Sequence, residues 1–408
     1  MADKRVFGLA WKQDGRVMAY PFPAGDGSGT PKPDPFPPDP GISLACGKMT
    51  AFVRKDDGTI SSMGQNDYGQ LGRNVSTGTW NAPNVGTIPG LDGVVQMSCA
   101  FGATHFLLEN GTVRNAGYNG YGSLGRNVES GSSAATNFGM IPTVSKAKKI
   151  GSADNVFHVL RHDGTIWNAG QNSYGQLGRN VASGSESATN FGMIPDMYDA
   201  VDFVCSRYTL YVLKADGSVW SAGLNADGQL CRAVASGSAS ATNFGPIPDL
   251  AGVKKMICGE NVVHFLLSDG TVRNAGSLAD GRLCRAAEAG TAEQTNLGTI
   301  PGVTDAEDVA GRGETLFIRR AGGTVWNGGA NSLGQLCRVV ESGDPAALNF
   351  GPIPDLTDVT EMTVSDWTAF FKLADGTIWN GGNNEYGQIG RISEGASAAE
   401  TNFGLLTI

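Results

Sequence analysis

Residues 163–178 read DGTIWNAGQNSYGQLG, and close copies of this stretch stand at residues 57–72 and 375–390. The glycine that follows Asp163 marks a strict period, because a glycine recurs every 53 residues through most of the chain. These glycines are Gly58, Gly111, Gly164, Gly217, Gly270, Gly323 and Gly376. Seven copies with no insertion or deletion between these turns identify a repeat protein.

Each repeat predicts short strands joined by tight turns. Residues 155–160 (NVFHVL) and 165–170 (TIWNAG) are rich in apolar, β-branched and aromatic residues, which favour strands. The intervening Asp163-Gly164 predicts a two-residue type I′ hairpin turn, since glycine supplies positive φ. Residues 190–195 (NFGMIP) fit a short edge strand, where proline is tolerated. Three to four strands per unit are typical of a propeller blade, so the predicted fold class is an all-β, seven-bladed β-propeller.

The high glycine content predicts many turns, and the amino-acid composition is that of a water-soluble protein. The chain has 408 residues with 59 Gly and 18 Pro, and its formal net charge is −9. No run of Lys or Arg is longer than Lys148-Lys149, so nucleic acid is not an expected partner. The first twenty residues lack the apolar core of a signal peptide, and no apolar run is long enough to span a membrane. We therefore expect a soluble protein without membrane insertion, either cytoplasmic or incorporated into a virion.

The run at residues 163–178 resembles the repeat of the regulator of chromosome condensation family, whose signature is DG-x-hydrophobic-x-x-WG-x-N-x-x-GQLG. The resemblance covers residues 41–408 and implies a seven-bladed ring, which the count of seven copies matches. WD-repeat propellers fit less well, because the sequence contains no Trp-Asp dipeptide. Kelch propellers fit less well because the double glycine that opens a kelch unit is not repeated. Within the family, nucleotide exchange on a nuclear GTPase uses a β-wedge and a basic tail that this sequence lacks. Other relatives bind proteins through loops on one ring face, which requires nothing that is missing here.

The sequence divides into three predicted regions. Residues 1–20 read as a β-hairpin with its own turn at Asp14-Gly15, serving as a closing or docking element. Residues 21–40 form a proline-rich strap, with a polyproline II tether and a plain linker as equal alternatives. Residues 41–408 form the propeller. Because Gly15 lies 43 residues before Gly58 rather than 53, an added hairpin is favoured over an eighth blade, and an eight-bladed ring is the alternative.

Several chemically suggestive residues fall on the period and are therefore interpreted as scaffold. One arginine occupies the same position in every copy, where its guanidinium is expected to bond carbonyls or a carboxylate between blades. The seven are Arg73, Arg126, Arg179, Arg232, Arg285, Arg338 and Arg391. Three histidines share a packing position with aromatic residues, as the column Phe52, His105, His158, Tyr211, His264, Phe317 and Phe370 shows. The seven cysteines fall on two such columns and are expected to be free thiols.

No catalytic, cofactor or metal motif was found, so an enzyme is not expected, and no cofactor or metal is predicted. A hydrolase with its site in the central channel is the third interpretation. It requires acidic and basic residues at non-periodic positions to converge on the ring centre.

Function is therefore sought in what is not repeated: the N-terminal arm and the Ser/Ala/Glu-rich loops, such as residues 181–189, which vary in charge at constant length. The leading interpretation is a non-catalytic structural or recognition propeller in a phage virion, tail or similar assembly, contacting protein partners or neighbouring subunits. The alternative is a soluble cytoplasmic protein-binding regulator or inhibitor. The candidate partner-binding residues are Trp11, Tyr20, Phe22, Phe36, Trp80, Glu129, Glu186, Glu288 and Glu341.

Overall fold

A computed structural model describes residues 7–11, 17–21, 44–47, 49–55, 57–259, 261–312, 314–344, 348–365, 367–393 and 401–407. The chain divides into two compact units, Met1–Asp39 and Pro40–Ile408, and each is described by itself. In the first unit, β1 (Phe7–Trp11) pairs antiparallel with β2 (Val17–Pro21) in a two-stranded sheet. In the part of the chain that the structure describes, no helix is long and apolar enough to cross a membrane.

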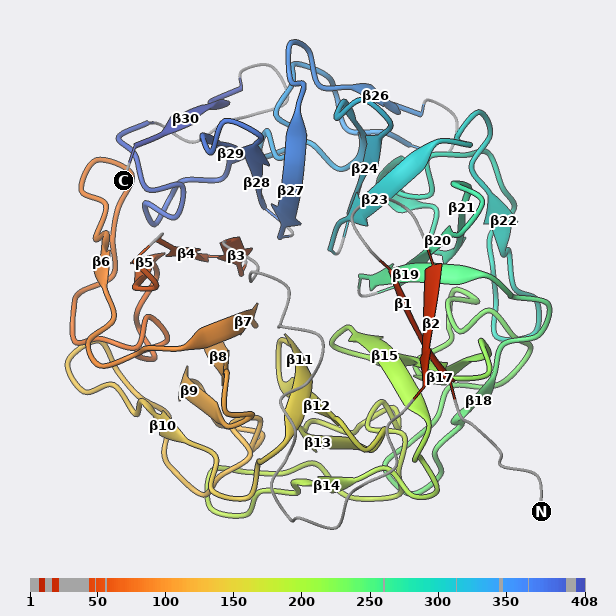
Figure 1. The fold of residues 1–408 in the computed structure, drawn as a ribbon, viewed down its shortest axis with the longest axis horizontal. Helices are drawn as coiled ribbons and strands as arrows, with labels where there is room; N and C mark the ends of the chain where they lie inside the picture. The colour runs from red at the N-terminus through yellow and green to blue at the C-terminus, as the bar shows by residue number, and fades with distance from the viewer. Residues whose placement is uncertain are drawn as a thin grey trace. The chain divides into compact units, whose positions relative to one another are not determined.

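The second unit is a ring of seven four-stranded antiparallel sheets, as predicted (Figure 1). Blade 1 consists of β3 (Leu44–Cys46), β4 (Thr50–Arg54), β5 (Ile60–Gly64) and β6 (Gly86–Thr87). Blade 2 consists of β7 (Val94–Cys99), β8 (Ala103–Leu108), β9 (Val113–Gly117) and β10 (Gly139–Met140). Blade 3 consists of β11 (Ala147–Ala153), β12 (Val156–Arg161), β13 (Ile166–Gly170) and β14 (Gly192–Met193).

The remaining four blades repeat this order. Blade 4 consists of β15 (Ala200–Cys205), β16 (Thr209–Lys214), β17 (Val219–Gly223) and β18 (Gly245–Pro246). Blade 5 consists of β19 (Val253–Cys258), β20 (Val262–Leu267), β21 (Val272–Gly276) and β22 (Gly298–Thr299), with a short 3₁₀ turn η1 (Ala279–Gly281). Blade 6 consists of β23 (Ala306–Ala310), β24 (Thr315–Arg320), β25 (Val325–Gly329) and β26 (Gly351–Pro352). Blade 7 consists of β27 (Val359–Val364), β28 (Thr368–Leu373), β29 (Ile378–Gly382) and β30 (Gly404–Leu406).

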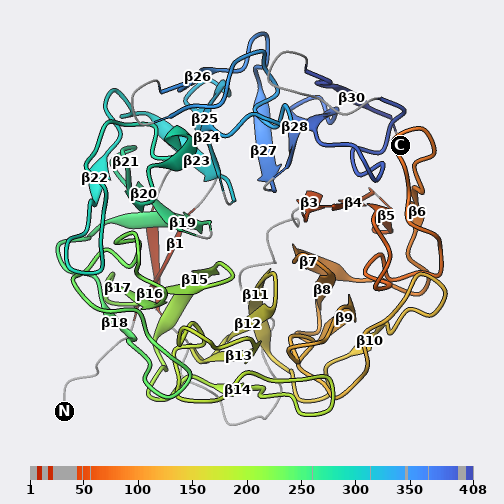
Figure 2. The same cartoon turned by 180° about the vertical axis from the view of Figure 1, so that it is seen from behind.

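The first strand of each blade faces the ring centre and the two- or three-residue fourth strand lies on the outside, which both views of the ring show (Figures 1 and 2). Each blade is one continuous stretch of sequence. The ring therefore closes between blades 7 and 1 through side chains and not through a shared sheet. Leu44 and Met63 of blade 1 pack with Phe370 and Leu406 of blade 7 in one buried cluster. The Leu44 amide also donates to Glu361 Oε1 at 3.3 Å across this junction.

The hairpin turn differs from the predicted type. In blade 3 the Arg161 amide donates to the Thr165 carbonyl at 2.9 Å, and the Gly164 amide donates back to the Arg161 carbonyl at 3.1 Å. Within this turn only Gly164 has a positive φ, 76°. The loop is thus a three-residue turn with a glycine bulge, and the type I′ prediction was wrong. The cause is Asp163, whose Oδ1 accepts from the Thr165 amide at 3.0 Å and from its hydroxyl at 2.6 Å.

The periodic arginines bond carbonyls inside their own blade, not between blades as expected. Arg179 Nε donates to Asn168 Oδ1 at 2.7 Å, and its Nη2 donates to the carbonyls of Asn168 and Asn190. The same fork, reaching eleven residues back and eleven residues forward, occurs in all seven repeats. Each arginine therefore ties the third strand of its blade to the segment that precedes the fourth.

The histidine column is buried between blades. His105 stacks on Phe157 of the next blade with ring centroids 4.0 Å apart, and His158 lies 5.8 Å from the Phe203 ring. Burial lowers the pKa of each of the three column histidines to about 3, so they are neutral at physiological pH. The seven cysteines are free thiols, as expected, and six of them are buried.

Candidate functional site

The turn between the first and second strands differs in every blade. No two copies share the same pair of residues there. The pairs are Lys48-Met49, Phe101-Gly102, Asp154-Asn155, Arg207-Tyr208, Glu260-Asn261, Gly313-Glu314 and Asp366-Trp367. Since the first and second strands that flank this turn are paired in the same register from blade to blade, these positions alter the surface without altering the scaffold.

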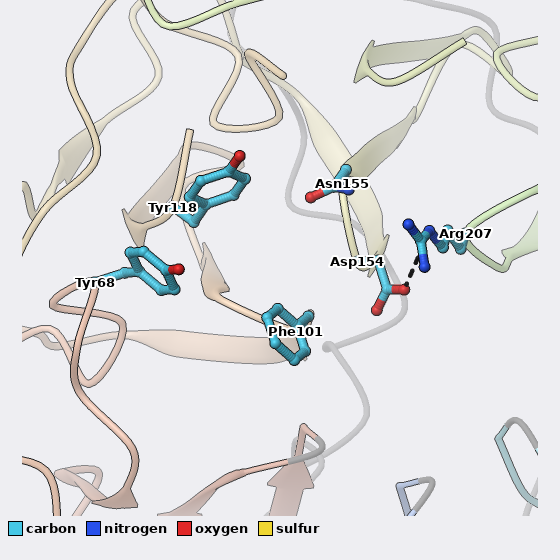
Figure 3. A pocket seen from close by; sticks show the side chains of 6 residues that line it. All are labelled: Tyr68, Phe101, Tyr118, Asp154, Asn155 and Arg207. Carbon is cyan, nitrogen blue, oxygen red and sulfur yellow. Dashed lines mark ion pairs between the residues drawn. The ribbon is translucent and has the colours of Figure 1, made fainter. Parts of the chain in front are cut away.

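Three of these turns surround a hollow of about 300 Å³ on the ring face (Figure 3). The hollow is lined by Tyr68, Phe101, Tyr118, Asp154, Asn155 and Arg207. Phe101 follows β7, Asp154 and Asn155 follow β11, and Arg207 follows β15, so that blades 2, 3 and 4 each contribute their turn. Tyr68 follows β5 of blade 1 and Tyr118 follows β9 of blade 2. The residues come from four consecutive blades.

One side of the hollow is aromatic. The rings of Tyr68 and Tyr118 are tilted by 59° with centroids 5.1 Å apart, and Phe101 beside them is 38% exposed. Gly102 permits this packing, because a Cβ there would lie 3.1 Å from both Tyr68 Cδ2 and Tyr118 Cβ. Burial raises the pKa of Tyr118, with smaller contributions from neighbouring Tyr121 and Tyr68. The Tyr118 hydroxyl therefore remains a hydrogen-bond donor at neutral pH.

The opposite side is polar and carries no net charge. Arg207 Nε lies 3.7 Å from Asp154 Oδ2, as the dashed line in Figure 3 marks. The same Nε is buried and has no hydrogen-bond acceptor within range. Its guanidinium lies 4.8 Å from the centre of the Tyr208 ring, which packs edge-on against Tyr174 at 5.2 Å. Asn155 Nδ2 makes a long bond of 3.4 Å to Gln171 Oε1.

The face is uneven around the ring. Tyrosine occupies one position of the loop after the third strand in four copies, Tyr68, Tyr121, Tyr174 and Tyr386. The other three copies carry Asp227, Asp280 and Leu333. Tyrosine therefore stands at this position in blades 1, 2, 3 and 7, and an acidic or aliphatic residue stands there in blades 4 to 6.

The first strands of the blades carry charged residues, but these stand at one repeat position and not at the non-periodic positions that the hydrolase interpretation requires. Lys149 pairs with Asp202 of the next blade, and Lys255 pairs with Asp308 at 2.6 Å in the same way. From blade 6, Arg312 Nη1 donates to the Cys99 carbonyl of blade 2 at 2.6 Å. Each lysine pairs with an aspartate of the adjacent blade, so these ion pairs join neighbouring blades, and the Arg312 bond joins blade 6 to blade 2 across the channel.

Cysteines also line the channel. Burial raises the pKa of Cys205 to about 12 and that of Cys258 well above its usual value, so both thiols stay protonated at neutral pH. Among the described residues, no group of three or more His, Cys, Asp or Glu side chains is placed to hold a metal ion.

The predicted partner-binding residues of the ring do not gather in one site. Trp11 and Tyr20 fall on β1 and β2, where only the backbone is described, and Phe22 and Phe36 lie outside the described residues. Trp80 is 41% exposed, and three of the glutamates are exposed at one repeated loop position, namely Glu129, Glu288 and Glu341.

Glu186 and its loop contact the preceding blade. Glu186 Oε1 accepts from the Ser130 amide at 2.9 Å and from its hydroxyl, which also lowers the pKa of the carboxyl group. In the same loop the Thr189 amide donates to Asn127 Oδ1 at 2.9 Å. A Cβ on Gly184 would lie 2.7 Å from the Tyr121 carbonyl, so the loop lies close against blade 2. This loop was predicted to be a recognition surface because its charge varies between copies. Its hydrogen bonds to the loop of blade 2 instead join the two blades, and we call such a contact a clasp.

The hollow itself was missed by the sequence predictions. A signal for it was available: aligning the seven copies shows that the turn pair is unique in each, whereas the Ser/Ala/Glu-rich loops keep a common glycine and Thr-Asn ending in most copies.

Comparison with known proteins agrees with the repeat. No protein-family model matches the chain. Among curated proteins it is similar to the probable E3 ubiquitin-protein ligase HERC4 of mouse, with 28% identity over 199 residues, covering 46% of this chain and 18% of that protein. It is also similar to human E3 ubiquitin-protein ligase HERC2, with 30% identity over 141 residues, covering 34% of this chain and 3% of that protein. The chain thus matches less than a fifth of the length of these relatives.

Solved structures match over nearly the whole chain. Yeast RCC1 (Prp20), in its complex with Kap60, superposes with a TM-score of 0.68 and 15% identity, covering 90% of this chain and 85% of that one. The ring has the fold of an RCC1-type propeller. Human WBSCR16 gives a TM-score of 0.67 with 20% identity, covering 86% of this chain and 94% of that one. At these identities the likeness concerns the fold of the RCC1-type propeller, and its function is argued from the site.

Proposed function

We propose that this RCC1-type propeller is a non-catalytic, protein-binding regulator whose partner contacts the ring face that carries the hollow. The observation that carries the proposal is the set of seven different turn pairs on one constant scaffold, three of which meet at the hollow. Exposed aromatic and arginine side chains around a depression are the residue types that dominate protein–protein binding energy. The pairing of charges in the central channel supports a binding role over a hydrolytic one.

The comparisons favour this regulator interpretation over an assembly component. Neither the HERC relatives nor the RCC1 and WBSCR16 structures are described as parts of a virion or tail. Yeast RCC1 was solved in complex with a protein, Kap60, which is consistent with a protein partner for this chain. A contact through the N-terminal arm, with Trp11, Tyr20, Phe22 and Phe36, remains a prediction, as does a cytoplasmic location.

Photo-cross-linking tests the proposal at two positions of equal exposure. Phe101 at the hollow and Leu348 beside the outer strand of blade 6 are both 38% exposed. Each is replaced in turn by the photoreactive analogue p-benzoylphenylalanine in the full chain, and cross-linked proteins are identified after irradiation in the source cells. A discrete partner captured from position 101 and not from position 348 is expected. Capture from neither position, or only from position 348, would contradict the proposed binding face.

A further inference from the structure

The hollow combines an aromatic side, a polar side and zero net charge, which restricts the kind of peptide that fits it. From this combination we propose that the hollow binds a proline-rich segment in the polyproline II conformation, presented by the protein partner. The inference rests on the proposed function, since it names the chemistry of the partner at the same face.

The aromatic side suits proline rings. A polyproline II helix has three residues per turn, so its side chains point in three directions and two of them can contact one surface. Tyr68, Tyr118 and Phe101 present rings from two blades, and the 59° tilt between the tyrosines gives faces in different orientations. Aromatic-lined grooves are the usual receptors for such segments, because the extended ligand loses little conformational entropy on binding.

The polar side supplies donors, which is what a proline-rich ligand lacks. Proline has no N–H, and the carbonyls of a polyproline II segment have no internal partner, so the ligand offers acceptors only. The Nε of Arg207 is buried and lies 3.7 Å from Asp154 Oδ2, so this atom is not one of the donors available to a ligand. Asn155 Nδ2 makes only a 3.4 Å bond, and the Tyr118 hydroxyl is kept protonated. Two side-chain donors, the Asn155 amide and the Tyr118 hydroxyl, thus border the hollow, while the Asp154 carboxylate faces Arg207.

Charge and backbone geometry disfavour the other peptide classes. An acidic peptide would compete with Asp154 for Arg207 and would approach a chain of net charge −9. Addition of a β-strand requires an open sheet edge, whereas turns and loops line this hollow. A neutral, acceptor-rich, apolar segment meets neither obstacle.

Direct binding of a labelled peptide tests the assignment. The probe is fluorescein-labelled decaproline, titrated with the full chain and followed by fluorescence anisotropy, with glycine–serine and polyglutamate peptides of equal length for comparison. We expect saturable binding of decaproline, with a Kd on the order of 100 μM for one short motif, and at least about tenfold weaker binding of the other two peptides.

Two matched variants locate the binding. Tyr68→Asp and Tyr386→Asp make the same change at equivalent repeat positions, and only Tyr68 lines the hollow. Aspartate already stands at this position in two other copies, Asp227 and Asp280, so the ring tolerates it. We expect Tyr68→Asp to weaken decaproline binding by about tenfold or more, and Tyr386→Asp to leave it within about twofold.

The outcomes separate this inference from the proposed function. Absence of saturable decaproline binding, equal loss in both variants, or tighter binding of polyglutamate would overturn the proline assignment. If a partner still cross-links from position 101 in those cases, the proposed binding face stands and only the ligand class is wrong. If cross-linking from position 101 also fails, both are wrong.

Discussion

The seven arginines and the seven turns of this ring behave in opposite ways. The arginine is present in all seven repeats. In each repeat its guanidinium donates the same set of hydrogen bonds to residues eleven positions away in the same blade. Every turn pair is different, although the strands that carry it keep the same register. Repetition therefore marks what the fold needs, and variation at constant geometry marks the surface available for recognition.

Removing an arginine should cause the largest loss of stability. Arg179→Ala leaves three acceptors in the blade without their donor, and we expect a loss of about 3 kcal/mol in the free energy of unfolding. Urea denaturation measures it, with Lys148→Ala at an exposed position as the control, where a change under about 0.5 kcal/mol is expected. A loss below about 1 kcal/mol for Arg179→Ala would show that the fork is not structural.

The buried histidines should make stability depend on pH. The pKa of His158 is about 3 in the folded chain and near 6.5 when exposed, so the folded state binds fewer protons below pH 6.5. Its stabilising contribution is complete above pH 6.5 and is lost as the pH falls towards 3. At pH 5 the loss is about 2 kcal/mol relative to pH 7.5.

Replacing His158 by phenylalanine tests this pH dependence of stability. Phenylalanine fits the site because three other repeats carry it at the equivalent position, as Phe52, Phe317 and Phe370. His158→Phe should remove about 2 kcal/mol of the difference in unfolding free energy between pH 7.5 and pH 5. Substituting the exposed His162 by Asn serves as the control. An unchanged pH dependence in His158→Phe would contradict a buried neutral imidazole.

The clasps between blades should contribute less. Asn127→Ala removes the acceptor for the Thr189 amide, and we expect a loss of about 1 kcal/mol. The equivalent positions of blades 4 and 5 hold Ala233 and Ala286, so Ala233→Asn should add a clasp and stabilise the ring by about 0.5 kcal/mol. Urea midpoints of the two variants, moving in opposite directions, would confirm the clasp; movement in the same direction would contradict it.

The recognition face should contribute least of all to folding. Phe101 is 38% exposed, so Phe101→Ser is expected to change the free energy of unfolding by less than about 0.5 kcal/mol. A loss comparable to that of Arg179→Ala would place Phe101 in the scaffold instead of at a binding surface.

The period predicted the blades because a strict repeat imposes one backbone on every copy. Finer features depended on side-chain contacts that spacing does not reveal. The type I′ prediction failed because Asp163 bonds to Thr165. The arginine fork was predicted between blades because the repeat spacing does not show which acceptors a guanidinium reaches. Glu186 was expected to meet a partner, but its carboxylate holds Ser130 of the neighbouring blade.

The most direct test of a division between scaffold and recognition face is to measure partner affinity in two variants that change one region each. Arg179→Lys alters the scaffold and Phe101→Ser alters the face. The partner captured from position 101 is titrated by biolayer interferometry at a temperature where circular dichroism shows both variants folded. We predict that Phe101→Ser weakens binding by about tenfold or more and that Arg179→Lys changes it by less than about twofold. Equal affinities for Phe101→Ser and the unmodified chain, or a selective loss in Arg179→Lys, would contradict the account.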